Sequence, residues 1–173
     1  KYNIGYNVIE RELKFKEGEV YNRSKMLESE RNFTKLAIIQ LGRVTPDSVD
    51  MERRVINTKV NITLNNKYEL TPSLSAVYQS NRLFGGAGIE YKDKDFFGAG
   101  RIFTVGLEGL FNSIDINSIK LTFSLFQPFL FNNNITATIS TTFGLVNFSK
   151  AVEYLGSQNL LRLTYYISDH TFY

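Results

Sequence analysis

Side chains that could support catalysis or metal binding are few and scattered along the 173 residues. His170 is the only histidine, and with its neighbour Asp169 it supplies too few ligands for a metal site. Serines are numerous, but no Ser-His-acid arrangement can be argued around this histidine. Cysteine is absent, which excludes disulfides and thiolate metal sites. We therefore expect no enzyme activity, no metal and no cofactor.

A glycine cluster at Gly85, Gly86 and Gly88 invites comparison with a nucleotide-binding loop. Such a loop follows a strand and opens a helix, and that context is missing here. Glycines within a strand that mark a bend or a close approach are the better interpretation. The net charge of +3 is too small to indicate nucleic acid as a partner.

The chain is organised around the stretch from Leu83 to Gly109. Its apolar residues alternate with small or charged ones on both sides of the turn at residues 92–100. A period of two puts one set on each face of a sheet, so this stretch predicts two strands. Four more segments alternate in the same way. They predict strands at Leu70–Ser80, Ile119–Gln127, Ile135–Leu145 and Leu160–Ile167.

One face of these six segments is apolar, and the other carries Ser, Thr, Gly and charged residues. In a soluble β-sandwich the apolar face meets a second sheet, whereas in a membrane barrel it meets lipid and the polar face lines a lumen. No apolar run reaches the ~18 residues of a transmembrane helix, but alternation halves the apolar content of barrel strands. On the polar face we expect a salt-linked interior formed by Glu90, Glu108, Lys120 and Arg162.

Residues 1–69 differ in composition, because charged residues are dense there. Apolar residues within Tyr2–Lys16 predict one or two strand segments, with Gly18 in the turn that follows. Asn22 and Ser29 are expected to cap two short helices. Two strands complete the domain, the first ending in a turn at Pro46 and the second covering Val55–Leu64. This strand-helix-helix-strand-strand order predicts a small α+β domain.

The order of motifs resembles the BamA/TamA superfamily of outer-membrane assembly factors. The turn KDKDFFGAG resembles that family's N-L-F-G-x-G signature, which joins the second and third barrel strands. Segments around Gly18 and Tyr21, Ser29–Leu36 and Val60–Leu64 resemble successive parts of its last POTRA domain. The residues of the turn that occupy signature positions, with Asp for Asn and Phe for Leu at the first two, are Asp95, Phe96, Phe97, Gly98 and Gly100.

The resemblance implies an α+β POTRA domain (β-α-α-β-β) at 1–69, followed at 70–173 by antiparallel transmembrane β-barrel strands. These would form a partial barrel of about six strands of sixteen. Six strands cannot close a membrane barrel, since the smallest have ~8, so the rest would come from a longer chain or from another polypeptide. The implied location is the outer membrane of a Gram-negative cell, with the N-terminal domain in the periplasm. The implied partners are nascent outer-membrane proteins, outer-membrane lipids and accessory lipoproteins, with no nucleic acid.

The first predicted barrel strand is weakly built. Pro72 removes a ladder donor and suits an edge position, unless it only marks the strand's start. The serines add little packing. Such an edge could open as a lateral gate and pair with an incoming strand. Its residues are Leu70, Pro72, Ser73, Leu74, Ser75, Ala76 and Tyr78. The remaining alternatives are a two-partner-type secretion pore, a passive porin and a soluble β-sandwich binding module.

Overall fold

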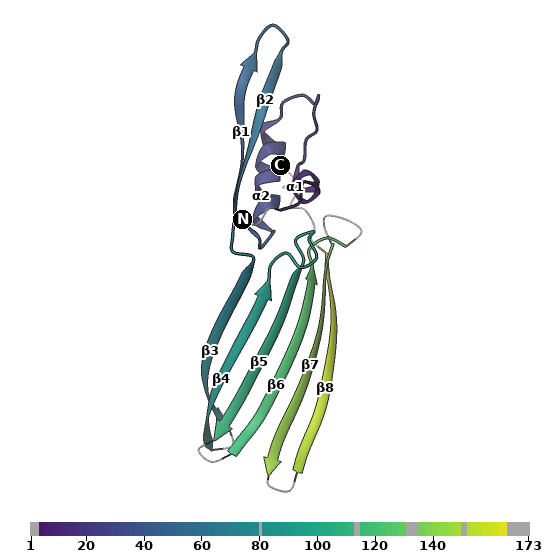
Figure 1. Cartoon of the computed structure of the whole chain (residues 1–173). Helices are drawn as coiled ribbons and strands as arrows, with labels where there is room; N and C mark the ends of the chain where they lie inside the picture. The colour runs from purple at the N-terminus through teal and green to yellow at the C-terminus, as the bar shows by residue number, and fades with distance from the viewer. Residues whose placement is uncertain (1–3, 80, 113–114, 131–134, 150–151, 166–173) are drawn as a thin grey trace. The chain divides into compact units, whose positions relative to one another are not determined.

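The computed structural model describes residues 4–79, 81–112, 115–130, 135–149 and 152–165. It divides into two compact units, one of residues 1–67 with 95–100 and one of residues 68–94 with 101–173. The first unit holds two helices and a two-stranded sheet, and the second holds a six-stranded sheet. Each unit is described by itself (Figure 1).

The first unit begins with helix α1 (Tyr6–Glu12), so the strand expected across Tyr2–Lys16 is wrong for these residues. Val8 and Glu12, one helical turn apart, are the two buried residues of α1. Residues at i and i+4 share one face of a helix. The described order is therefore helix, helix, strand, strand, and the β-α-α-β-β order lacks its first strand here.

Helix α2 (Arg23–Thr34) is continuous, where the sequence predicted two short helices. Asn22 caps it, since its side-chain oxygen accepts the backbone N–H groups of Ser24 at 2.9 Å and Lys25 at 3.3 Å. Ser29 is not a cap. It lies buried in mid-helix, donating to the Lys25 carbonyl and accepting the Lys14 amide, each at 2.8 Å. These bonds tie the incoming chain to the buried face of α2.

The two-stranded sheet pairs β1 (Ile39–Asp50) with β2 (Val55–Leu64). The turn expected at Pro46 is wrong, because β1 continues through it and the turn lies at residues 51–54. The pairing register shifts between Pro46 and Ser48, and a bulge is one of the few places where a strand accepts proline. The core of this unit lies between α2 and the start of β1, with Phe33, Leu36 and Ile38 at 0–1% exposure.

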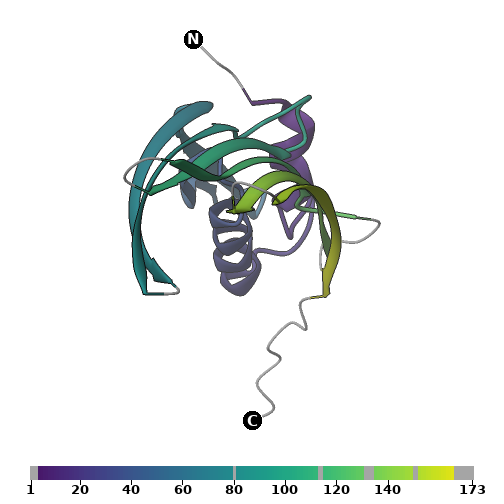
Figure 2. The same ribbon diagram turned by 90° about the horizontal axis from the view of Figure 1, so that it is seen from below.

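The second unit contains the six predicted strands as one antiparallel meander. They are β3 (Tyr68–Gln79), β4 (Arg82–Asp93), β5 (Ile102–Asn112), β6 (Asp115–Gln127), β7 (Ile135–Ser149) and β8 (Val152–Tyr165). The last begins eight residues before its predicted start, and the predicted end at Ile167 lies outside the described residues. Within the described residues the sheet is open, because β3 and β8 pair with β4 and β7 only. Seen along the strands in Figure 2, the sheet curls into an arc.

Candidate functional site: two sheet faces and an open strand edge

The outward face of the six-stranded sheet is apolar and exposed. Leu74 on β3, Leu161 on β8 and Ile139 on β7 are 90%, 65% and 55% exposed. Register rows connect such residues across the sheet, for example Pro72, Ile89, Leu107, Leu121 and Phe143. Soluble monomers rarely expose a contiguous apolar patch that runs across a whole sheet. This face therefore has the character of a surface that meets an apolar medium.

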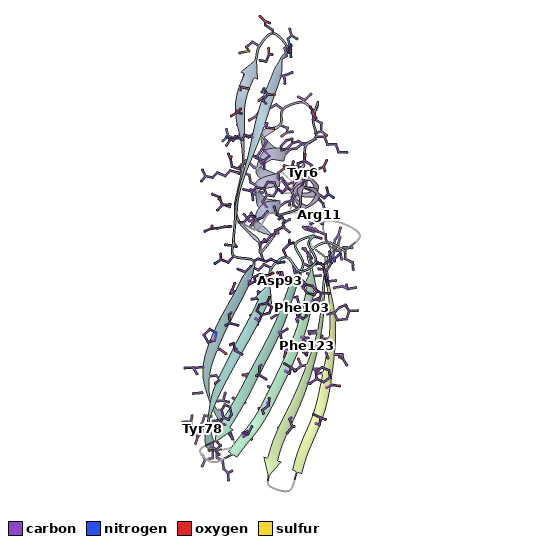
Figure 3. All side chains as sticks on the ribbon, in the orientation of Figure 1. Tyr6, Arg11, Tyr78, Asp93, Phe103 and Phe123 are labelled. Carbon is purple, nitrogen blue, oxygen red and sulfur yellow. The ribbon has the colours of Figure 1, made fainter. Side chains whose placement is uncertain are left out.

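Aromatic residues mark the ends of this face. Tyr68 and Tyr91 stack at 6.1 Å between ring centroids at one end, and Tyr78 lies at the other (Figure 3). Ten residues separate Tyr68 from Tyr78 along β3, which is about 33 Å of strand. A tilt of about 40° reduces that length to roughly 25 Å, the height of the apolar band of an outer-membrane barrel between its aromatic girdles.

The opposite face is polar and holds the charged residues singled out from the sequence. Glu108 of β5 and Lys120 of β6 are register partners, and Lys92 pairs with Glu90 at 3.1 Å. Arg162 lies opposite Thr138, in a different register row from Glu108 and Lys120. The structure thus places Glu108 opposite Lys120, which is one of the expected opposite-charge pairs. It keeps Arg162 apart from both of these residues.

Strand β3 is an edge of the described sheet. Pro72 is its fifth residue and not its start, and the pairing with β4 runs without a register shift through Pro72 and Ile89. A proline within such a regular ladder is expected to put its missing N–H on the unpaired edge. Gly86 and Gly88 face Ser75 and Ser73 in the register, and a Cβ at either glycine would collide with the serine hydroxyl.

The turn between β4 and β5 has a left-handed backbone over four successive residues: φ is +53° at Phe97, +75° at Gly98, +63° at Ala99 and +70° at Gly100. Asp95, 3% exposed, organises it. Its carbonyl oxygen accepts the Gly98 N–H at 3.1 Å, and its carboxylate accepts the Gly100 N–H at 2.8 Å. The sequence predicted a turn here, but not that Phe97 and Ala99 would take a conformation that costs a residue with a side chain ~1–2 kcal/mol.

Phe96 and Phe97 lie at the tip of this turn with ring centroids 4.3 Å apart, and Phe97 is 84% exposed. Gly18 has a φ of +81° in the turn before α2, and Tyr21 is 43% exposed.

His170 and Asp169 lie outside the described residues. Among the residues described, no three His, Cys, Asp or Glu side chains gather where they could hold a metal ion. No helix in the described ranges is long and apolar enough to cross a membrane.

Glu12 is a buried carboxylate that sequence reasoning missed. Its side chain is 0% exposed, its Oε1 accepts the Arg11 Nε–H at 3.0 Å, and its Oε2 has no hydrogen-bond partner. Burial raises the pKa of this carboxyl above its usual value, and the Arg11 guanidinium only partly opposes that. Only its position one helical turn after Val8 could have indicated burial.

Because the pKa of Glu12 is raised, ionisation of this carboxyl lowers the stability of the folded state at neutral pH. Above its ordinary pKa the folded state binds more protons here than the unfolded state does, so stability falls as the pH rises through the folded pKa. We expect Glu12→Gln to stabilise the first unit by about 1 kcal/mol at about pH 7. This gain should disappear at about pH 4, where both states protonate Glu12.

The measurement is amide hydrogen exchange of α1 and α2 in the full chain, corrected for intrinsic rates at each pH. Glu10→Gln is the matched control, because Glu10 is exposed on the same helix and its loss changes the net charge equally. A similar gain from both variants would mean that net charge, and not the burial of Glu12, is responsible.

No protein-family model matches the sequence, and no curated protein matches it. A solved structure does match, the crystal structure of BamA from Haemophilus ducreyi lacking POTRA domains 1–3. The TM-score is 0.61 at 16% sequence identity, over 91% of this chain and 30% of that chain. At this identity the likeness is one of fold. The chain therefore has a fold similar to part of that BamA structure, and it spans 30% of the length of that chain.

Proposed function

We propose that this chain is part of an outer-membrane assembly factor that inserts and folds outer-membrane proteins. Residues 1–69 act as a POTRA-like periplasmic domain, in which Gly18 and Tyr21 belong to its turn before α2. Residues 70–173 are the first strands of the barrel, with their apolar face in lipid and Glu90, Glu108, Lys120 and Arg162 toward the lumen. The BamA-like fold and the exposed apolar face support this assignment.

The observation that carries the mechanism is the β3 edge. The edge away from β4 has no partner strand among the described residues, and an unpaired edge offers a row of N–H and C=O groups to another strand. Pro72 on β3 removes one donor from that row, so any strand that closes the barrel there forms an incomplete seam. An incoming strand can replace it by β-augmentation, so β3 templates its client without chemical catalysis.

Site-specific crosslinking in the full-length protein tests this mechanism. These 173 residues contain no cysteine, so Ser73→Cys or Ser75→Cys adds a single thiol to this part of the protein. We expect both variants to trap nascent outer-membrane proteins that carry cysteine in their terminal strand. Ser124→Cys, on the polar face of the central strand β6, is the matched control and should trap none.

Trapping of only the protein's own last barrel strand would contradict templating, because it would show a firmly paired seam. That outcome is also what a passive porin would give. Equal trapping at Ser124→Cys would show that clients contact the lumen without selecting the β3 edge.

A further inference from the structure

An arginine interrupts the apolar face at one end of the six-stranded sheet. Arg101 directly precedes β5, and its Nε–H donates to the Oε1 of Gln127, the last residue of β6, at 2.7 Å. Gln127 follows Phe123 and Leu125 at intervals of two, so it shares their outward face. Arg101 stands two residues before Phe103, which Figure 3 shows near one end of the sheet. The guanidinium therefore lies at the margin of the face that the proposed function places in lipid.

Two hydrogen bonds in series fix the orientation of this guanidinium. The Nε2 amide of Gln127 donates to the Phe129 carbonyl oxygen at 2.8 Å, and the Oε1 of Gln127 accepts from Arg101. Both side chains are half-buried. An arginine at the margin of an apolar face can otherwise extend into water, whereas here its Nε is held against the sheet. The N–H groups on Nη1 and Nη2 remain, and they form a planar fork.

No acidic side chain of the described residues forms an ion pair with Arg101, whose side chain bonds to Gln127. Asp93 of β4 is the acidic residue of the sheet nearest to it in the register, opposite Phe103, and it is buried at 7% exposure. A half-buried cation at the margin of hydrocarbon is costly unless an anion accompanies it. The position of Arg101 therefore indicates that its partner is an anion from the surroundings of the protein.

Tyrosines on the same face indicate the depth of this guanidinium in the bilayer. Tyr68 on β3, Tyr91 on β4 and Tyr165 on β8 lie at the same end of the sheet as Arg101 and are 57%, 39% and 62% exposed. Aromatic girdles of outer-membrane barrels lie at the membrane interface, which is the level of the lipid headgroups. The anion that every phospholipid carries at this level is its phosphate, and a guanidinium fork binds phosphate through two parallel hydrogen bonds.

We propose that Arg101, oriented by Gln127, binds the headgroup phosphate of a phospholipid in the periplasmic leaflet. The leaflet follows from the chain order, because β3 begins at this end of the sheet directly after the N-terminal unit. Leu125 and Leu163, on the same face, would contact the acyl chains of that lipid. The inference rests on the proposed function for the placement of the apolar face in lipid, but it does not depend on templating by β3.

Lipid retention by the full-length protein tests the site. The protein is held in non-ionic detergent, dioleoyl phosphatidylglycerol is titrated in, and the bound lipid is counted by native mass spectrometry. Arg101→Gln should weaken retention by about tenfold. Gln127→Leu keeps the charge but frees the guanidinium, so it should weaken retention by a smaller factor. Arg162→Gln is the matched control, because it removes the same charge from the opposite face and should leave retention unchanged.

Equal losses from Arg101→Gln and Arg162→Gln would overturn the site, because general charge attraction would then explain the binding. Two competitors identify the ligand. Dioleoylglycerol has the same acyl chains without the phosphate and should not displace the phosphatidylglycerol. Inorganic phosphate should displace it only weakly, because it lacks the acyl chains. Displacement by inorganic phosphate at the affinity of the lipid would show that Arg101 binds free anions, which contradicts a headgroup site.

A spin label separates failure of this inference from failure of the proposed function. A nitroxide at Leu121→Cys, on the outward face of β6, should be accessible to membrane-dissolved oxygen. If it is accessible and Arg101→Gln retains phosphatidylglycerol as the unmodified protein does, the phosphate site is wrong and the membrane assignment stands. If the nitroxide is not accessible, the face does not meet lipid and both proposals fail. Failure of Ser73→Cys to trap clients would overturn templating alone.

Discussion

Replacing Phe123 by arginine is expected to lower the stability of the sheet in a bilayer by several kcal/mol, about 2–4 from the charge and about 0.5–1.5 from the lost ring. Phe123 lies on the outward face of β6, 36% exposed, and its ring meets Phe143 edge-on at 6.5 Å between centroids. An arginine facing lipid near the midplane of a barrel costs about 2–4 kcal/mol. Losing the aromatic pair adds about 0.5–1.5 kcal/mol. The measurement is a urea titration of the full-length protein folded into lipid vesicles.

Two controls separate the charge from the loss of the ring. Ser124→Arg introduces the same charge one residue later, on the polar face, and should cost much less because in the proposed barrel its guanidinium would meet water in the lumen. Phe123→Leu removes the aromatic pair without adding charge and should cost only the smaller of the two contributions. Equal losses from Phe123→Arg and Ser124→Arg would mean that the two faces do not differ in their surroundings, which contradicts the membrane assignment.

The six strands were predictable because alternation of apolar and polar residues is a local signal. The sheet uses each strand with the two faces that this alternation predicts. Each strand presents apolar residues to one side only, so a period of two persists along its length. The start of β8 was missed where Ser157 and Asn159 replace apolar residues on the outward face.

The first unit was harder to predict because several of its positions are decided by packing. Tyr6–Glu12 carries apolar residues that fit a strand as well as a helix, and the burial of Glu12 beside Val8 appears only in the folded helix. Ser29 has the chemistry of a cap but is used as a buried bridge to the Lys14 amide. Pro46 has the chemistry of a turn, but a register shift accommodates it within β1.

The features of the candidate site that depend on local backbone constraints were predictable from the sequence, and those that depend on strand register were not. The turn at residues 92–100 was predictable because glycine constrains the backbone locally, whereas the role of the strand that contains Pro72 stays a prediction. The partners of the charged residues were not predictable, because register decides that Glu108 faces Lys120 and that Arg162 faces Thr138. The left-handed backbone at Phe97 and Ala99 also escaped prediction, because such φ values are rare for residues with a Cβ.

The second large effect is expected in the first unit, where Phe33 joins α2 to β1. Phe33 is 0% exposed, and a Cβ built on Gly42 of β1 would lie 2.6 Å from its ring. Glycine at position 42 therefore lets the ring lie directly on the strand. Phe33→Ala should remove about 3–5 kcal/mol of stability, which is a large fraction of what a unit of this size possesses.

We expect Phe33→Ala to open α1, α2 and the start of β1 to hydrogen exchange and protease in the full chain, while the six-stranded sheet keeps its protection. Leu27→Ala is the matched control, because Leu27 lies on the same helix but is 47% exposed, so its truncation should cost well under half as much. Loss of protection in both units after Phe33→Ala would show that they unfold together. The core of α2 and β1 would then support the whole chain, and the N-terminal unit could not act as a separately folded periplasmic domain.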